Sequence, residues 1–190
     1  MDDRSGPCCN GGEGDAGART LILGGVRSGK SRLAERLAIE SALPVVYVAT
    51  ARAGDAEMTR RIAGHRERRP RDWGLVEEPL LLAEVLEREC APDRCILVDC
   101  LTLWLTNWLM TTDESGLHDQ TRALLDVVSR APGRLIMVGN ETSMGVVPLG
   151  ALSRRFCDLA GVLHQDLAAR CDRVILTVAG LPLVLKGEAA

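Results

Sequence analysis

The apolar residues of this 190-residue chain fall into short unbroken runs, separated by segments with helical spacing. Such runs predict buried strands, because a strand covered on both faces consists of nearly continuous Val, Ile and Leu. The runs lie at about residues 20–24, 45–49, 95–99, 134–138 and 174–178. After the turn-forming sequence Gly180-Leu181-Pro182, a short apolar run at 183–185 ends the pattern.

Helical spacing fills the intervals between these runs. It predicts helices over about residues 30–41, 55–68, 80–89, 101–110, 118–130 and 149–170. Alternating strands and helices indicate an α/β fold, with a mostly parallel sheet covered by helices on both faces. We expect one domain over residues 19–190, preceded by a disordered leader over 1–18, which is rich in glycine and scattered charges.

Composition narrows the possible functions. The chain has 23 basic and 26 acidic residues, so its net charge of −3 argues against a general nucleic-acid or membrane-surface role. No apolar run is long enough to span a membrane, and no signal peptide is recognisable. Seven cysteines without a C-x-x-C pair fit a reducing cytoplasm. Any basic binding site must therefore be local.

The most specific motif follows the first strand. The sequence Gly24-Gly25-Val26-Arg27-Ser28-Gly29-Lys30-Ser31 fits the phosphate-loop pattern G-x-x-x-x-G-K-[ST], and it lies between a predicted strand and a predicted helix. In such loops backbone N–H groups surround one anion, Lys30 would reach the β- and γ-phosphates, and Ser31 would hold Mg²⁺. The alternative is a chance match on an ordinary glycine turn, which the flanking elements disfavour. We predict binding of a nucleoside triphosphate.

Polar residues at other strand ends extend this site. Asp99 ends the third strand as a Walker-B acid would, and is predicted to hold Mg²⁺ together with Ser31; the alternative is a cap of the following helix. Thr50 and the pair Asn140-Glu141 follow two other strands, where ligands of parallel sheets bind. Thr50 fits a loop or cap role equally well, whereas the pair looks more like part of a site.

A basic segment forms the third candidate. Residues 60–71 contain six arginines, among them Arg66 and Arg69, with His65 in their midst. Arginine forks bind polyphosphates bidentately, and like-charge repulsion favours the neutral, nucleophilic form of a histidine. A solvated basic helix face with an incidental histidine explains the same pattern. From the residues alone the two readings are equally good.

Together these segments resemble the bifunctional adenosylcobinamide kinase / adenosylcobinamide-phosphate guanylyltransferase family. The likeness covers nearly everything from Thr20 to Lys186 and is highly specific as a set. It is carried by the phosphate loop, Tyr47-Val48-Ala49-Thr50, Asp55-Ala56-Glu57-Met58, Arg61-Ile62, His65-Arg66-Glu67-Arg68-Arg69-Pro70, Val98-Asp99-Cys100-Leu101-Thr102, Trp104-Leu105-Thr106-Asn107, Asn140-Glu141, Gly145-Val146-Val147-Pro148, Arg155-Phe156-Cys157-Asp158-Leu159-Ala160-Gly161 and Ala179-Gly180-Leu181-Pro182.

The resemblance implies two activities in cobalamin nucleotide-loop assembly. ATP or GTP would phosphorylate adenosylcobinamide, and GMP would then pass from GTP through a guanylyl-histidine to give adenosylcobinamide-GDP and pyrophosphate. The family's histidine corresponds to His65, with Lys30 and Asp99 completing the expected catalytic set. The resemblance also implies a RecA-like P-loop fold and a homo-oligomer, in known members a trimer with active sites at subunit contacts.

The chain departs from the family pattern at three places. Gly64-His65 stands where members often have two histidines, Thr142-Ser143 follows Asn140-Glu141, and His164 occupies an asparagine position. Two rival functions are another small-molecule P-loop kinase and a nucleotide-gated switch. A guanine-reading N-K-x-D, expected of a GTPase switch, is absent from the sequence.

Overall fold

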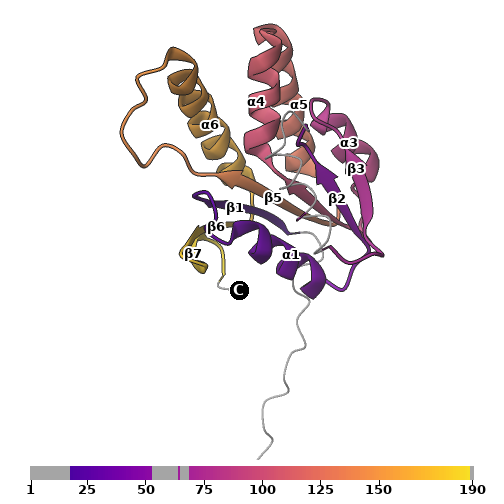
Figure 1. The fold of residues 1–190 in the computed structure, drawn as a ribbon. Coiled ribbons are helices and arrows are strands. Elements are labelled where there is room, and N and C mark those ends of the chain that lie inside the picture. The colour runs from indigo at the N-terminus through magenta and orange to yellow at the C-terminus, as the bar shows by residue number, and fades with distance from the viewer. Residues whose placement is uncertain (1–17, 53–63, 65–68, 189–190) are drawn as a thin grey trace, which may run out of the picture.

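A computed structural model describes residues 18–52, 64 and 69–188 of the chain (Figure 1). The described part contains one seven-stranded sheet with the strand order β3-β2-β4-β5-β1-β6-β7. The strands are β1 (Arg19–Gly24), β2 (Val45–Ala49), β3 (Gly74–Glu77), β4 (Cys95–Asp99), β5 (Arg134–Asn140), β6 (Arg173–Val178) and β7 (Leu181–Lys186).

All neighbouring strands are parallel except β6 and β7, which are antiparallel. The central strands β4 and β5 are almost wholly buried, which explains their unbroken apolar sequences. This confirms the predicted mostly parallel sheet. In register, Gly24 at the end of β1 lies beside Asn140 of β5 on one side and Thr177 of β6 on the other. Three strand ends therefore meet where the phosphate loop begins.

Helices cover both faces of the sheet, as predicted (Figure 1). On one face, α1 (Lys30–Glu40) buries Leu33, Ala34, Leu37 and Ala38 against residues such as Ile22 and Leu97. The other face carries a larger core shared by α3 (Leu82–Glu89), α4 (Leu101–Thr111), α5 (Glu114–Arg130) and α6 (Ala151–Arg170). None of the described helices is long and apolar enough to cross a membrane.

Strand β3 was not predicted from the sequence. It is a four-residue edge strand paired with β2, and its side chains are mostly exposed. Without an apolar run to bury, its sequence carries no strand signal, and its pairing comes from the exposed edge of β2.

The chain end forms a hairpin that the sequence indicated only as a turn and a short apolar run. Ala179 and Gly180 both have positive φ, 52° and 81°, as a two-residue type I′ turn requires. Pro182 lies within β7, where the edge position tolerates its missing N–H.

Helix α5 begins four residues before its predicted start. Asp113 is its N-cap and accepts a hydrogen bond from the backbone N–H of Gly116 at 2.9 Å. The glycine and polar residues of this first turn hide the helical period, whereas the cap marks the true start.

Two predicted segments lie outside the described residues. These are the leader, up to residue 17, and the helix predicted over 55–68, apart from Gly64.

The hairpin turn braces the phosphate loop. The N–H of Gly180 donates to the carbonyl oxygen of Ser28 at 2.9 Å. A Cβ at Gly29, where φ is +97°, would lie 3.1 Å from the Cα of Gly180. At Gly24 the fit is tighter, because a Cβ would lie 2.5 Å from both Ser28 Oγ and the carbonyl oxygen of Thr177. Gly24 is therefore required by close backbone packing.

We predict that Gly24→Ala destabilises the fold and that Gly25→Ala does not. A methyl group at Gly24 must displace backbone, which costs about 1–3 kcal/mol, whereas a Cβ at Gly25 meets nothing within 4 Å. Thermal unfolding of the ligand-free variants measures the difference, and Gly24→Ala should lower the midpoint by several degrees. Equal midpoints for the two variants would contradict the packing argument.

Candidate active site

The phosphate loop and the first turn of α1 form the centre of the site. Gly29 caps α1 in a left-handed conformation, and no side chain bonds to the first N–H groups of the helix. The first turn also contains no acidic residue. An anion such as a phosphate can thus bind at this helix end, where the positive end of the helix dipole meets no capping side chain or carboxylate of the first turn.

Lys30 points back over the loop. Its Nζ donates to the carbonyl oxygen of Gly25 at 3.2 Å. Its charge also acts on the Cys100 thiol, whose pKa is raised to about 11 by burial and further by Asp99, while Lys30 opposes this shift. The ammonium group therefore lies between the loop and the end of β4, where a bound triphosphate would need a cation.

Asp99 is the last residue of β4 and accepts a hydrogen bond at Oδ2 from the Tyr47 hydroxyl, at 3.1 Å. The N-cap of α4 is the next residue, Cys100, and no side chain caps that helix. The helix-cap alternative for Asp99 is therefore not what the structure shows. Its carboxylate lies at the carboxyl edge of the sheet, the edge at which the phosphate loop leaves β1.

Thr50 is fully buried and ties the end of β2 to the end of β4. Its Oγ1 donates to the carbonyl oxygen of Cys100 at 2.7 Å and accepts from the Cys100 N–H at 2.9 Å, while its own N–H donates to the Asp99 carbonyl oxygen at 3.4 Å. These bonds brace the backbone on both sides of Asp99. A direct nucleotide contact by Thr50 stays a prediction.

The pair Asn140-Glu141 lies directly beside the phosphate loop. The Glu141 N–H donates to the carbonyl oxygen of Gly24 at 3.0 Å, and the Asn140 N–H donates to Thr102 Oγ1 at 2.7 Å. Glu141 Oε1 accepts from the Ser143 N–H at 2.6 Å. The structure thus brings the predicted Glu141 to the loop, and the Thr142-Ser143 departure adjoins it.

His164 of α6 lies buried behind this pair, against Gly139 of β5. Burial lowers the pKa of the imidazole, and the charge of Glu141 opposes that shift. The His164 departure therefore lies against Gly139, near the end of β5, and the Thr142-Ser143 departure follows that strand in the sequence. Both lie at the same end of β5, beside the loop.

Of the basic segment, the structure describes Arg69, whereas His65 and Arg66 lie outside the described residues. The Arg69 guanidinium carbon lies 4.3 Å from the centre of the Tyr47 ring. Sequence reasoning did not assign Tyr47 a role. The signal was available, since Tyr47 is the only tyrosine of the chain and lies two residues before the end of a buried strand.

The candidate metal ligands are the Ser31 hydroxyl in the first turn of α1 and the Asp99 carboxylate. Both are hard oxygen donors, which Mg²⁺ prefers, and Mg²⁺ bound with nucleotide uses one or two protein oxygens besides phosphates and water. Within residues 18–52, 64 and 69–188, no three His, Cys, Asp or Glu side chains form a metal cluster. The donor set suits a cation that arrives with a triphosphate.

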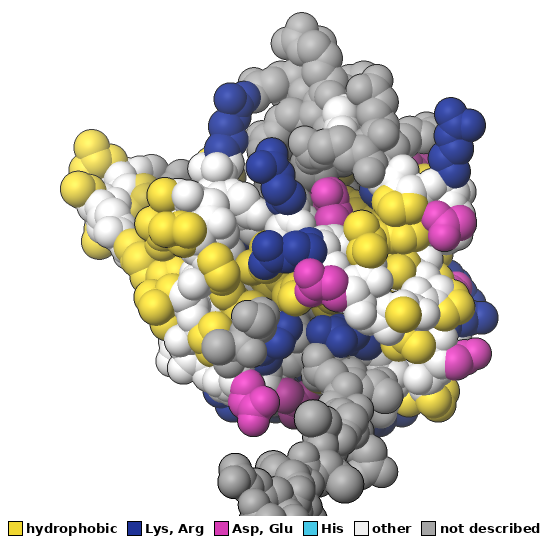
Figure 2. Space-filling view, turned by 90° about the horizontal axis from the view of Figure 1, so that it is seen from below, with side chains coloured by type: hydrophobic (Ala, Val, Ile, Leu, Met, Phe, Trp, Pro, Cys, Tyr) yellow, Lys and Arg dark blue, Asp and Glu magenta, His cyan; other side chains and the backbone are white. Residues whose placement is uncertain are grey.

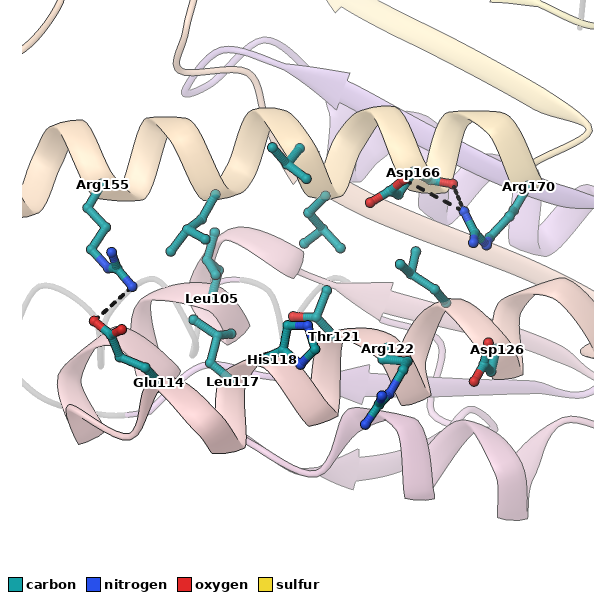
Figure 3. A pocket seen from close by; sticks show the side chains of 14 residues that line it. Leu105, Glu114, Leu117, His118, Thr121, Arg122, Asp126, Arg155, Asp166 and Arg170 are labelled. Atoms are coloured by element: carbon teal, nitrogen blue, oxygen red, sulfur yellow. Dashed lines mark hydrogen bonds and ion pairs between the residues drawn. The ribbon is translucent and has the colours of Figure 1, made fainter.

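A groove of about 530 Å³ lies away from these residues, between α4, α5 and α6 (Figure 3). Leu105 and Leu117 line it, and its charged residues include two pairs: Arg155 with Glu114 at 2.8 Å and Arg170 with Asp166 at 3.9 Å. None of the residues predicted to bind nucleotide lines this groove.

The sequence has relatives that match over most of their length. It is 63% identical over 170 residues to the bifunctional adenosylcobalamin biosynthesis protein CobP of Pseudomonas aeruginosa. The aligned residues cover 90% of this chain and 98% of that protein. It is 37% identical over 179 residues to the bifunctional adenosylcobalamin biosynthesis protein CobU of Salmonella typhimurium, covering 87% and 98%.

Solved structures support the fold at low sequence identity. An ATPase of a bacterial type III secretion system superposes with a TM-score of 0.54 at 12% identity, over 89% of this chain and 57% of that one. The RadB recombinase superposes with a TM-score of 0.50 at 19% identity, over 86% and 76%. These neighbours confirm a P-loop NTPase fold of the RecA-like kind.

The sequence pattern of one family matches residues 20–185, from the first residues of β1 into β7. That range contains the phosphate loop, Asp99 and Glu141, which the fold has brought to one edge of the sheet. The chain belongs to the cobinamide kinase / cobinamide phosphate guanyltransferase family.

Proposed function

We propose that this protein phosphorylates adenosylcobinamide with ATP or GTP and then transfers GMP from GTP to the product, giving adenosylcobinamide-GDP and pyrophosphate. Family membership supports both reactions. The observation that carries the proposal is the phosphate loop with Lys30 bent over it and Asp99 across the same sheet edge.

In the kinase step, the loop residues Gly24 to Ser31 hold the triphosphate, and Lys30 exchanges its bond to Gly25 for one to the phosphates. Phosphoryl transfer depends mainly on positioning and charge neutralisation, which this cradle supplies. Ser31 and Asp99 would hold Mg²⁺, which when bound neutralises charge on the phosphates. The substrate hydroxyl attacks the γ-phosphorus, and the nucleoside diphosphate leaves.

In the transferase step, a ring nitrogen of His65 attacks the α-phosphorus of GTP. A P–N bond forms, the bond from the α-phosphorus to the bridging oxygen breaks, and pyrophosphate leaves. A phosphate oxygen of adenosylcobinamide phosphate then attacks the same phosphorus and releases His65. Splitting one difficult transfer into two easier ones is what a covalent nucleophile achieves.

We assign the remaining nucleotide contacts to Thr50, Arg66, Arg69 and Glu141. Glu141 is supported by its backbone bond to Gly24, and Arg69 by its contact with the ring of Tyr47, whose hydroxyl donates to Asp99. We place the reactions in the cytoplasm, in keeping with the free thiols of the described cysteines: Cys90, Cys95, Cys100, Cys157 and Cys171.

We also propose a homo-oligomer, a trimer by family resemblance, that uses the segment between β5 and α6. Met144, Val146, Val147 and Leu149 are 77%, 96%, 72% and 97% exposed. This segment projects from the body of the fold in Figure 1, and apolar side chains gather toward the same side in Figure 2. Elsewhere on the face in Figure 2, basic and acidic side chains are interspersed. A second copy of the chain would cover these apolar residues.

We predict that Lys30→Ala abolishes phosphate transfer while the protein stays folded. Lys30 lies in the phosphate loop and is not one of the buried core residues, and its Nζ donates to the carbonyl oxygen of Gly25. Loss of one charge-assisted phosphate contact costs on the order of 10²-fold or more in rate. Mass spectrometry of products from adenosylcobinamide, GTP and Mg²⁺ measures both steps. If the wild-type protein makes adenosylcobinamide phosphate but no adenosylcobinamide-GDP, the result favours a simple kinase. If it makes only GDP, the result favours a nucleotide-gated switch.

We predict that the wild-type protein, mixed with GTP and Mg²⁺ but no corrinoid, gains the mass of one GMP per site and releases pyrophosphate. The adduct should be labile in acid and stable in base, as a P–N bond is. Because neutral imidazole must attack, labelling should fall as the pH drops through histidine's ordinary value of about 6.5, or at lower pH if the neighbouring arginines favour the neutral form.

The control is His65→Ala, which should carry no GMP and make no adenosylcobinamide-GDP but keep kinase activity, because phosphorylation needs no covalent intermediate. A His65→Ala protein that still becomes guanylylated would place the nucleophile elsewhere, with His164 the next residue to replace.

We predict that Val146→Asp combined with Leu149→Asp converts the oligomer to monomers, because a carboxylate at a buried subunit contact is strongly disfavoured. Light scattering coupled to gel filtration measures the mass. The matched control is Ile39→Asp, an exposed apolar position on α1, 57% exposed, which should leave the mass unchanged. A monomeric wild-type protein, or a double variant of wild-type mass, would contradict this use of the segment.

A further inference from the structure

Tyr47 lies where two parts of the candidate active site meet. It is the third residue of β2, 4% exposed, and pairs in register with Leu97 of β4. Asp99 follows Leu97 by two residues, so it lies on the same face of the sheet, because side chains alternate along a strand. The Tyr47 hydroxyl reaches this carboxylate diagonally, at 3.1 Å.

The hydroxyl acts as a donor to Asp99. The Tyr47 hydroxyl oxygen lies 3.1 Å from Oδ2 of Asp99, and an ionised carboxylate can only accept a hydrogen bond. A protonated phenol facing a carboxylate donates its hydrogen, and this bond fixes one of the two carboxylate oxygens. The carboxylate is thereby oriented before any ligand arrives.

The ring of the same residue holds Arg69. The guanidinium carbon lies 4.3 Å from the ring centre, within the range of a cation–π contact. Arg69 Nε is buried and has no hydrogen-bond partner among the described residues. The described contacts thus place this guanidinium by stacking on Tyr47, five residues before β3 begins.

Packing alone does not explain a tyrosine here. The other residues of β2 are Val45, Val46, Val48 and Ala49, all apolar, and phenylalanine would fill the same space. The hydroxyl adds only the bond to Asp99. The hydroxyl of Tyr47 thus contacts Asp99, the proposed metal ligand, and its ring contacts Arg69, a proposed nucleotide contact.

We infer that Tyr47 is a positioning residue that sets Asp99 through its hydroxyl and Arg69 through its ring, so that one side chain aligns the metal-binding carboxylate with the nucleotide-binding arginine. The inference rests on the proposed function. It divides the side chain into two separable parts: the hydroxyl governs dependence on the divalent cation, and the ring governs affinity for the nucleotide.

The test measures binding of a non-hydrolysable GTP analogue by calorimetry, with and without Mg²⁺. Tyr47→Phe should raise the Mg²⁺ concentration needed for half-saturation of the analogue complex by about 3- to 10-fold, the worth of one such hydrogen bond. Affinity for the analogue in EDTA should stay unchanged, because the ring remains under Arg69.

Double variants show whether Tyr47 acts through its two partners. Tyr47→Phe should add nothing to Asp99→Asn in Mg²⁺ dependence. Tyr47→Leu, which also removes the ring, should weaken metal-free binding by the same factor as Arg69→Ala, and the pair together should be no weaker. Val45→Ala is the matched control: it removes packing from the same strand and core, so it should lower the unfolding midpoint but leave Mg²⁺ dependence unchanged.

Wild-type Mg²⁺ dependence in Tyr47→Phe, or effects of Tyr47→Phe and Asp99→Asn that simply add, would overturn the hydroxyl's role. Wild-type metal-free affinity in Tyr47→Leu would overturn the ring's role. Either result leaves the proposed function intact as long as the wild-type protein binds the analogue. A wild-type protein that binds no nucleotide would overturn the proposed function and this inference with it.

Discussion

The close approach of three backbones at Gly24 is the constraint on which the site depends. The end of β1 lies between β5 and β6, with Glu141 bonded to its carbonyl oxygen and the Thr177 carbonyl where a Cβ would stand. Because glycine has no side chain, β1 can approach its neighbours this closely at the point where the chain leaves the sheet for the phosphate loop. The β6–β7 hairpin adds its bond from Gly180 to Ser28 and fixes the far side of the loop. The phosphate loop is therefore hydrogen-bonded to the neighbouring chain at both of its sides.

Around this cradle the strand ends are locked to one another by polar groups. The Thr50 hydroxyl forms hydrogen bonds with the Cys100 backbone, and the Tyr47 hydroxyl donates to the Asp99 carboxylate. Such bonds are strong in a buried setting, because the alternative is an unsatisfied polar group. Asp99 is thus held by its neighbours in β2, and the loop by its neighbours in β5 and β6. Catalytic geometry in this fold rests on bonds between strands far apart in sequence.

The two faces of the sheet carry hydrophobic cores of different size. The α1 face packs the smaller core beneath the helix that begins at the phosphate loop. The face of α3 to α6 holds the larger core and the groove between α4, α5 and α6. The exposed apolar residues before α6 begin at Met144, three residues after Glu141. A subunit contact through that segment would lie close in sequence to the site, which suits a family in which we expect active sites near subunit contacts.

The sequence by itself determined whatever depends on neighbouring residues. Unbroken apolar runs gave the five central strands, helical spacing gave α1, α4 and α6 nearly to their ends, and the glycine spacing located the phosphate loop. Tertiary structure decided the pairing of β3 with β2 and the hairpin geometry of β7. It also decided that the Thr50 hydroxyl bonds the Cys100 backbone and that Asp99 does not cap α4. It also gave Tyr47 its place between Asp99 and Arg69. Periodicity and motifs record which face of an element is buried, but a contact between residues 50 positions apart exists only once the sheet order brings two strand ends together.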